Sequence, residues 1–174
     1  DPSLIENYIA LSDMEYENNN IDLAIEYLNQ GAKINKTNFD LIIRSAKYQR
    51  ELKKYEEAIL TLKSVSITNE QITIMLEKEI FMIYIEQEKY SEAVIIGSQI
   101  VENMFNSTDI EDAALAETCY NVAICNRYLG YECYNKTLDA INQGITDKII
   151  LDSILQEAQK AIEYFDIAKD RFYD

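Results

Sequence analysis

The side chains in this chain that could do chemistry are few in kind, because histidine is absent from all 174 residues. Nucleophile systems that pair serine or cysteine with histidine are therefore excluded, and so is every metal site that needs an imidazole ligand. The chain has 31 acidic residues, so a pair of carboxylates is the remaining candidate for general acid–base catalysis. No glycine-rich phosphate loop or EF-hand pattern accompanies them, so we expect no enzymatic activity and no cofactor.

The cysteines are three in number and lie close together, at Cys119, Cys125 and Cys133. Their spacing does not match the patterns of zinc-binding motifs, and no histidine is present to complete a set. We therefore expect reduced, mostly structural thiols and no metal. Reduced thiols agree with a cytoplasmic location.

The formal net charge of −15 argues against nucleic-acid binding, since affinity for a polyanion comes largely from lysine and arginine. No run of 18 or more apolar residues occurs, and the first residues lack the basic and apolar regions of a signal peptide. Membrane insertion is therefore not expected. The first residue is Asp1 rather than methionine, so we expect the chain to be a fragment of a longer protein.

One segment departs from the acidic average. Residues 33–54 contain seven basic and two acidic side chains. Arg44, Lys47 and Glu51 are spaced by three and four residues, and Lys47 and Arg50 by three, so they share one face of a helix. Such a face could clamp a carboxylate of a bound peptide. The alternative is a solvated face whose cations pair with acidic residues of neighbouring helices, and pairs of that kind contribute little to stability.

The elements that must position these side chains are helices. The chain has one proline and four glycines, and apolar residues recur at intervals of three and four throughout. Three segments share a local pattern centred on Ala24, Ala58 and Ala93, which lie 34 and then 35 residues apart. A period of that length is typical of helix-turn-helix arrays, in which each repeat covers an apolar face of the next.

The spacing of these alanines and of the large and small residues before them resembles the tetratricopeptide repeat family. The resemblance implies an all-α, right-handed α-solenoid of antiparallel helix pairs, forming one domain over residues 1–174. By the family register the repeats span about residues 5–38, 39–72, 74–107 and 110–174. Asn18-Asn19-Asn20 and Lys53-Lys54 are then the turns within the first two repeats.

The fourth repeat is longer than the family unit. Its first helix is expected from Ile110 to about Leu129, but the matching second helix appears only at residues 161–168. Either the two helices are elongated and joined near Gly144, or residues 142–147 form a loop between inserted arms. Residues 131–141 keep a helical spacing of apolar side chains and lack proline, which favours elongated helices.

In this family the first helix of each repeat lines an inner groove that receives an extended or helical peptide. The register therefore implies a set of partner-binding residues, which are Tyr16, Arg44, Lys47, Arg50, Met82, Ile85, Tyr120, Asn121, Ile124, Arg127 and Tyr128.

The expected function is a non-catalytic scaffold that binds a peptide or helix of a partner protein. One alternative is a peptide-sensing regulatory domain of a bacterial signalling protein. Another is self-association of the C-terminal repeat into a homodimer, through a cluster of aromatic residues, namely Tyr131, Tyr134, Tyr164, Phe165, Phe172 and Tyr173.

Overall fold

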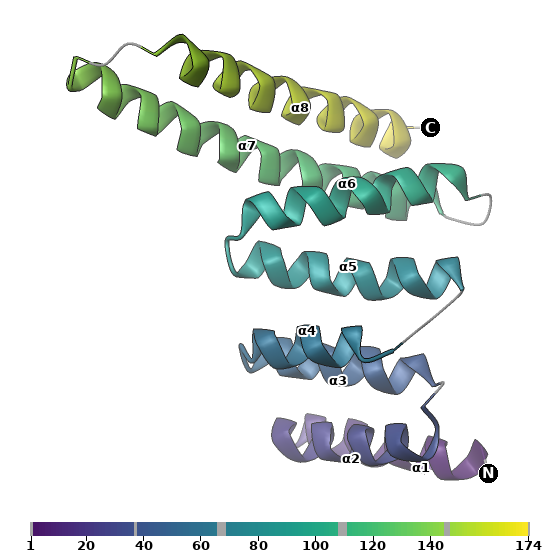
Figure 1. Cartoon of the computed structure of the whole chain (residues 1–174). Helices are drawn as coiled ribbons and strands as arrows, with labels where there is room; N and C mark the ends of the chain where they lie inside the picture. The colour runs from purple at the N-terminus through teal and green to yellow at the C-terminus, as the bar shows by residue number, and fades with distance from the viewer. Residues whose placement is uncertain (1, 37, 66–68, 108–110, 145–146, 174) are drawn as a thin grey trace. The chain divides into compact units, whose positions relative to one another are not determined.

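The chain is all-α. A computed structural model describes residues 2–36, 38–65, 69–107, 111–144 and 147–173, and within these ranges every regular element is a helix (Figure 1). The helices are α1 Pro2–Glu17, α2 Ile21–Ile34, α3 Phe39–Glu51, α4 Tyr55–Lys63, α5 Glu70–Glu86, α6 Tyr90–Asn106, α7 Asp112–Asn142 and α8 Lys148–Tyr173.

The helices fall into two compact units. Unit 1, Asp1–Ile83, holds α1 to α4 and most of α5, and unit 2, Tyr84–Asp174, holds the end of α5 with α6, α7 and α8. The single domain expected from the sequence remains a prediction. No helix among the described residues combines the length and the apolar character needed to cross a membrane.

One turn geometry occurs three times within the described residues. Each turn contains a residue with a positive φ, namely Asn19 at 61°, Lys53 at 57° and Glu88 at 57°. In each turn the next amide donates to the carbonyl five residues back at 2.8 to 2.9 Å, in the pairs Asn20 to Glu15, Lys54 to Gln49 and Lys89 to Tyr84. This hydrogen bond is characteristic of the Schellman motif, which closes a helix and reverses the chain.

The three alanines that define the sequence period have the same local setting. Ala24, Ala58 and Ala93 each follow one of these turns in the first part of a helix, and each is completely buried. A methyl group at this position lets a neighbouring helix approach closely. The period of 34 to 35 residues in the sequence therefore corresponds to a recurring piece of structure.

One hydrophobic cluster of unit 1 lies between α1, α2 and α3. Its buried members are Ile5, Ala24, Ile25, Leu28, Leu41 and Tyr48. Gly31 of α2 permits a close contact, because a Cβ atom there would lie 3.1 Å from Cδ1 of Leu41 and 3.2 Å from Cβ of Tyr8. A Cβ atom at position 31 would therefore require these neighbours to shift.

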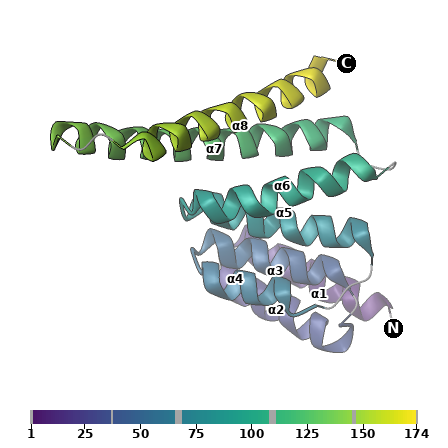
Figure 2. The same cartoon turned by 45° about the horizontal axis from the view of Figure 1, so that its top comes forward.

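Unit 2 is organised around α7, which packs against both α6 and α8 (Figure 2). The residues of α7 with least exposure are Leu115, Ala116, Thr118, Cys119, Val122, Ala123, Cys125 and Asn126. After Asn126, Thr137 is the one described residue of α7 that is buried. The rest of α7 extends past the end of α6 in Figure 1.

The prediction of elongated helices is confirmed. α7 has 31 residues and α8 has 26, and Gly144, which lies between them in the sequence, has a φ of 77°. The predicted end of the first helix near Leu129 is wrong, because α7 continues through Gly130 to Asn142. Glycine weakens a helix by only about 1 kcal/mol, which the apolar contacts on either side outweigh. The predicted start at Ile110 lies outside the described residues.

Candidate functional site

Arg44 is the centre of the cationic cluster predicted from the sequence. It extends from α3, where its Nη1 lies 2.9 Å from Oδ1 of Asp13 on α1 and its Nε lies 3.0 Å from Oδ2 of Asp40. The guanidinium is thus already bonded to two carboxylates of the chain. All three side chains are partly exposed, so each ion pair adds at most about 1 kcal/mol to stability.

Lys47 and Arg50 share a third carboxylate. Nζ of Lys47 lies 3.3 Å from Oε1 of Glu79 on α5, and Nη1 of Arg50 lies 3.9 Å from Oε2 of the same residue. The three cations of the predicted clamp therefore face acidic side chains of neighbouring helices, which is the alternative interpretation of the sequence pattern. An acidic ligand would have to displace those carboxylates.

Tyr16, also predicted as a binding residue, joins the same region. Its ring stacks on that of Tyr48, with centroids 4.4 Å apart and planes 11° apart, and its hydroxyl donates to Oε1 of Glu51 at 3.0 Å. The bond to Glu51 and the negative charge of that carboxylate raise the pKa of Tyr16. Burial, followed by the charge of Asp13, raises the pKa of Tyr48.

These side chains form a continuous band across α1, α3 and α5 of unit 1. We call it the polar belt, and its members are Asp13, Tyr16, Asp40, Arg44, Lys47, Tyr48, Arg50, Glu51 and Glu79. The structure thus brings four of the predicted binding residues together. The sequence placed Glu51 on the same helix face but did not identify Asp13, Glu79 and Tyr48 as the specific partners of these residues.

The remaining predicted residues lie elsewhere. Met82 is half-buried on α5 in unit 1, and Ile85 is half-buried in the part of α5 that belongs to unit 2. The other five all lie on α7 in unit 2 and are Tyr120, Asn121, Ile124, Arg127 and Tyr128.

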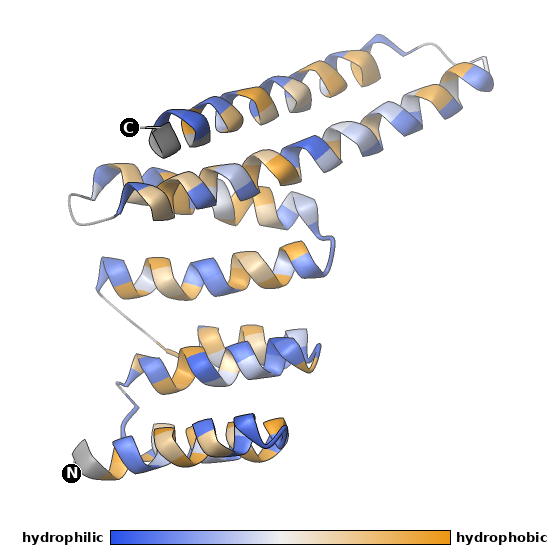
Figure 3. Cartoon of the chain, turned by 180° about the vertical axis from the view of Figure 1, so that it is seen from behind, coloured by the Kyte–Doolittle hydropathy of each residue, from blue (hydrophilic) through white to orange (hydrophobic). Residues whose placement is uncertain are grey.

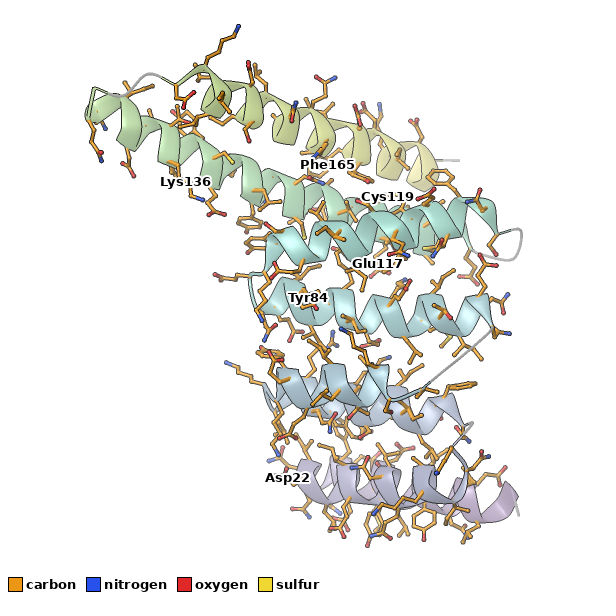
Figure 4. The ribbon with its side chains drawn as sticks, in the orientation of Figure 1. Asp22, Tyr84, Glu117, Cys119, Lys136 and Phe165 are labelled. Atoms are coloured by element: carbon orange, nitrogen blue, oxygen red, sulfur yellow. The ribbon has the colours of Figure 1, made fainter. Side chains whose placement is uncertain are left out.

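Aromatic contacts organise the exposed side of α7. Tyr128 stacks on Tyr90, the first residue of α6, with centroids 4.6 Å apart and planes 5° apart. The guanidinium carbon of Arg127 lies 5.5 Å from the centroid of the Tyr128 ring, within the range of a cation–π interaction. Tyr120 meets Phe165 of α8 edge to face at 5.8 Å. Figure 4 shows Phe165 on the side of α8 that faces α7.

A hollow of about 430 Å³ opens between α7 and α8. It is lined by Arg127, Gly130, Tyr131, Tyr134, Ile154, Ala158, Ala161, Ile162 and Phe165. The lining is apolar except for Arg127, whose described contact is with an aromatic ring and not with a carboxylate. The sequence signal for this site was the run of apolar residues at three- and four-residue intervals in both helices, which Figure 3 shows as recurring hydrophobic bands.

The aromatic cluster proposed for self-association is only partly exposed. Tyr131 and Tyr134 are half-exposed on α7, and Phe165 lines the hollow. The hydroxyl of Tyr164 instead donates to Oγ of Ser98 on α6 at 2.7 Å. The side chains of the other two members, Phe172 and Tyr173, lie outside the described residues.

The cysteines occur as free thiols in the described chain, with Cys119 and Cys125 buried and Cys133 half-buried. Burial raises the pKa of Cys125 to about 11, so this thiol stays protonated and unreactive at neutral pH. Across the part of the chain that the structure describes, no group of three or more cysteine, aspartate or glutamate side chains is placed to hold a metal ion.

Comparison of the chain with protein-family models finds no match, and none of the curated proteins compared with it matches.

Proposed function

We propose that the chain is a non-catalytic protein-binding module, built as a right-handed solenoid of antiparallel helix pairs similar to tetratricopeptide repeats. Support comes from the turn that recurs at Asn19, Lys53 and Glu88 and from the buried alanine that follows each turn. Identical local geometry at a period of 34 to 35 residues is what a stacked array requires, because each repeat must present the same face to the next.

The main support for a binding function is the polar belt. Its ion pairs and ring stack join the first helices of successive predicted repeats, α1, α3 and α5, and hold partly exposed polar side chains in fixed positions. Preorganised side chains lose little conformational entropy when a ligand binds. The belt is a surface on which a segment of a partner protein would dock.

The charges of the belt indicate what kind of segment would bind. Three cations, Arg44, Lys47 and Arg50, are balanced by the carboxylates of Asp13, Asp40, Glu51 and Glu79. Electrostatics alone would not hold a simple anion there. A polypeptide that offers both hydrogen-bond donors and acceptors, with an aromatic or aliphatic side chain to lie on Tyr16, fits the belt better.

The binding test compares partner capture by the wild-type chain and by the double variant Tyr16→Ala/Arg44→Gln. We expect the variant to lose the captured partner, with unchanged helical circular dichroism and unchanged affinity in a Leu60→Lys control. Leu60 lies on α4 and is 69% exposed, outside the belt. Equal affinity of the wild-type chain and the belt variant for the same purified partner, measured by calorimetry, would refute the assignment of this surface.

The solenoid itself is tested by small-angle X-ray scattering. A compact globule of 174 residues has a radius of gyration of about 16 Å. We expect the monomer to give a clearly larger radius and an asymmetric distance distribution, because a solenoid extends along its stacking axis. A radius near 16 Å with a symmetric distribution would contradict the proposed stack.

A further inference from the structure

The part of unit 2 that extends past α6 carries an uncovered apolar surface. We call residues 127–142 of α7 with residues 148–162 of α8 the arm. Tyr90, the first residue of α6, reaches Tyr128, so the described part of α6 stops near the base of the arm. The large apolar side chains of the arm face are Tyr131, Tyr134, Leu138, Leu151, Leu155 and Ile162, each between 39% and 67% exposed.

Helical spacing and a shared hollow together assign these six residues to one side of the helix pair. Tyr131, Tyr134 and Leu138 follow each other at intervals of three and four, which places them on one stripe of α7. Leu151, Leu155 and Ile162 follow at intervals of four and seven, which gives the matching stripe of α8. Tyr131, Tyr134 and Ile162 line the same hollow, so both stripes border it.

The arm face is large for an exposed surface. If a fully exposed side chain presents about 150–200 Å², these six partly exposed side chains together present roughly 500–650 Å² of mostly apolar area. The largest apolar patch on an ordinary monomer covers about 300–600 Å², so the arm face lies at the upper end of that range. It also supplies most of the roughly 800 Å² that each partner buries in a stable interface.

The shape of this face indicates its occupant. The hollow is lined by small residues, Gly130, Ala158 and Ala161, and by the half-exposed rings of Tyr131 and Tyr134. An interface with two-fold symmetry uses the same patch twice, so that patch must carry both the protrusions and the recess that receives them. The face is also two helices wide, which a single docked helix would leave partly open.

We propose that a second copy of this chain covers the arm face, so that the two arms form an antiparallel four-helix bundle. In this arrangement the tyrosines of each arm enter the hollow of the other, as knobs enter holes in helix bundles. None of the six side chains is charged. Each copy has a net charge of −15, so long-range repulsion opposes the association and added salt strengthens it.

The mass of the chain in solution tests the proposal. Sedimentation equilibrium of the 174-residue chain over a concentration series is expected to give a mass of about twice 20.2 kDa, with Kd decreasing as salt is raised. A mass of 20.2 kDa that persists to millimolar protein, corresponding to a Kd weaker than about 1 mM, would overturn the proposal.

A matched pair of substitutions locates the interface. Leu155→Lys places a charge on the arm face, and Leu60→Lys places one on a leucine of α4 with nearly the same exposure, 69% against 67%. We expect Leu155→Lys to raise the dimer Kd roughly 100-fold or more, since both copies lose a buried leucine, and Leu60→Lys to leave it unchanged. Ile162→Lys serves as the second variant, and circular dichroism confirms that each variant is folded.

Two further outcomes would refute the proposal. Dimerisation that Leu155→Lys and Ile162→Lys leave unaffected would place the interface elsewhere. A monomeric chain whose arm binds a helix of another protein would assign the face to a different occupant. The belt variant Tyr16→Ala/Arg44→Gln is expected to dimerise normally, so failure of this proposal and failure of the proposed function can be distinguished.

Discussion

Tyr16 and Tyr48 stack with their ring centroids 4.4 Å apart, which ties the end of α1 to α3 across the polar belt. The hydroxyl of Tyr16 also donates to Glu51, so one side chain makes both an aromatic and a polar contact with the next predicted repeat. A second stack, between Tyr90 and Tyr128, joins α6 to α7 in unit 2. Stacked tyrosine pairs thus connect neighbouring helices in both units.

The first prediction separates the two contacts of Tyr16. Tyr16→Ala removes the ring stack and is expected to lower the free energy of unfolding by about 0.5–1.5 kcal/mol. Tyr16→Phe keeps the stack and loses only a surface hydrogen bond, so a change below about 0.5 kcal/mol is expected. Urea unfolding measures both. Equal losses in the two variants would show that the hydroxyl, and not the ring, makes the stabilising contact.

The second prediction concerns the buried alanines. Ala58→Leu adds three carbon atoms where no space is available and is expected to destabilise the chain by about 1–3 kcal/mol. The matched control is Ala10→Leu on α1, where the side chain is exposed and the change should stay within about 0.5 kcal/mol. Thermal unfolding compares the two variants. Similar melting temperatures would contradict tight packing around Ala58.

The third prediction uses the left-handed turn residues. Glu88 has a φ of 57°, a conformation that costs a residue with a Cβ about 1–2 kcal/mol and glycine almost nothing. After allowance for the greater freedom of glycine in the unfolded chain, Glu88→Gly is expected to stabilise by about 0.5–1 kcal/mol. Glu102→Gly, within α6, should destabilise by about 1 kcal/mol. Denaturant titration checks that the two effects have opposite sign.

The fourth prediction concerns Glu77 of α5, whose Oε2 is buried without a hydrogen-bond partner among the described residues. Burial raises the pKa of this carboxyl. The native state then binds the proton more tightly than the unfolded state, so the protonated form is favoured at low pH and stability is lost as pH rises through the native pKa. Glu77→Gln is expected to stabilise by roughly 0.5–1 kcal/mol at pH 7 and by less near pH 4. Thermal melts at both pH values test this, and a gain that grows on acidification would contradict it.

The fifth prediction follows from the exposure of the thiols. At pH 8 a thiol-reactive dye should label Cys133 quickly and the buried Cys119 and Cys125 slowly, because burial holds the pKa of Cys125 at about 11. Cys133→Ser should remove the fast phase and leave the slow phases unchanged. Labelling of all three thiols at one rate in the folded chain would contradict the burial described here.

The local structure could be predicted where one stretch of sequence contains all the determining residues. The turns at Asn18–Asn20 and Lys53–Lys54 are examples, since a short polar stretch stands between two amphipathic segments, and asparagine tolerates a left-handed conformation. The elongated last helix pair was predicted for a similar reason, from the apolar spacing of residues 131–141. The end of α7 was misplaced because a single glycine resembles a helix stop when tertiary contacts are unknown.

The candidate site was less predictable because its geometry depends on contacts between distant segments. Arg44 and Lys47 were found from their charge and spacing, but Asp13 and Glu79, which neutralise them, come from other helices. The hollow is lined by Gly130 of α7 and Ala158 of α8, which are far apart in the sequence. Small residues such as these do not predict a hollow from the sequence alone, because the register between the two helices must be known first.

The abrupt end of burial after Asn126 also bears on how this protein can change over evolution. Beyond that residue the two helices mainly contact each other, so a deletion of about two turns from α7 with an equal one from α8 keeps every remaining side chain on its face. Relatives with longer or shorter versions of this hairpin are therefore expected to differ by multiples of about seven residues in each helix. Insertions of other lengths would rotate the apolar stripes away from each other.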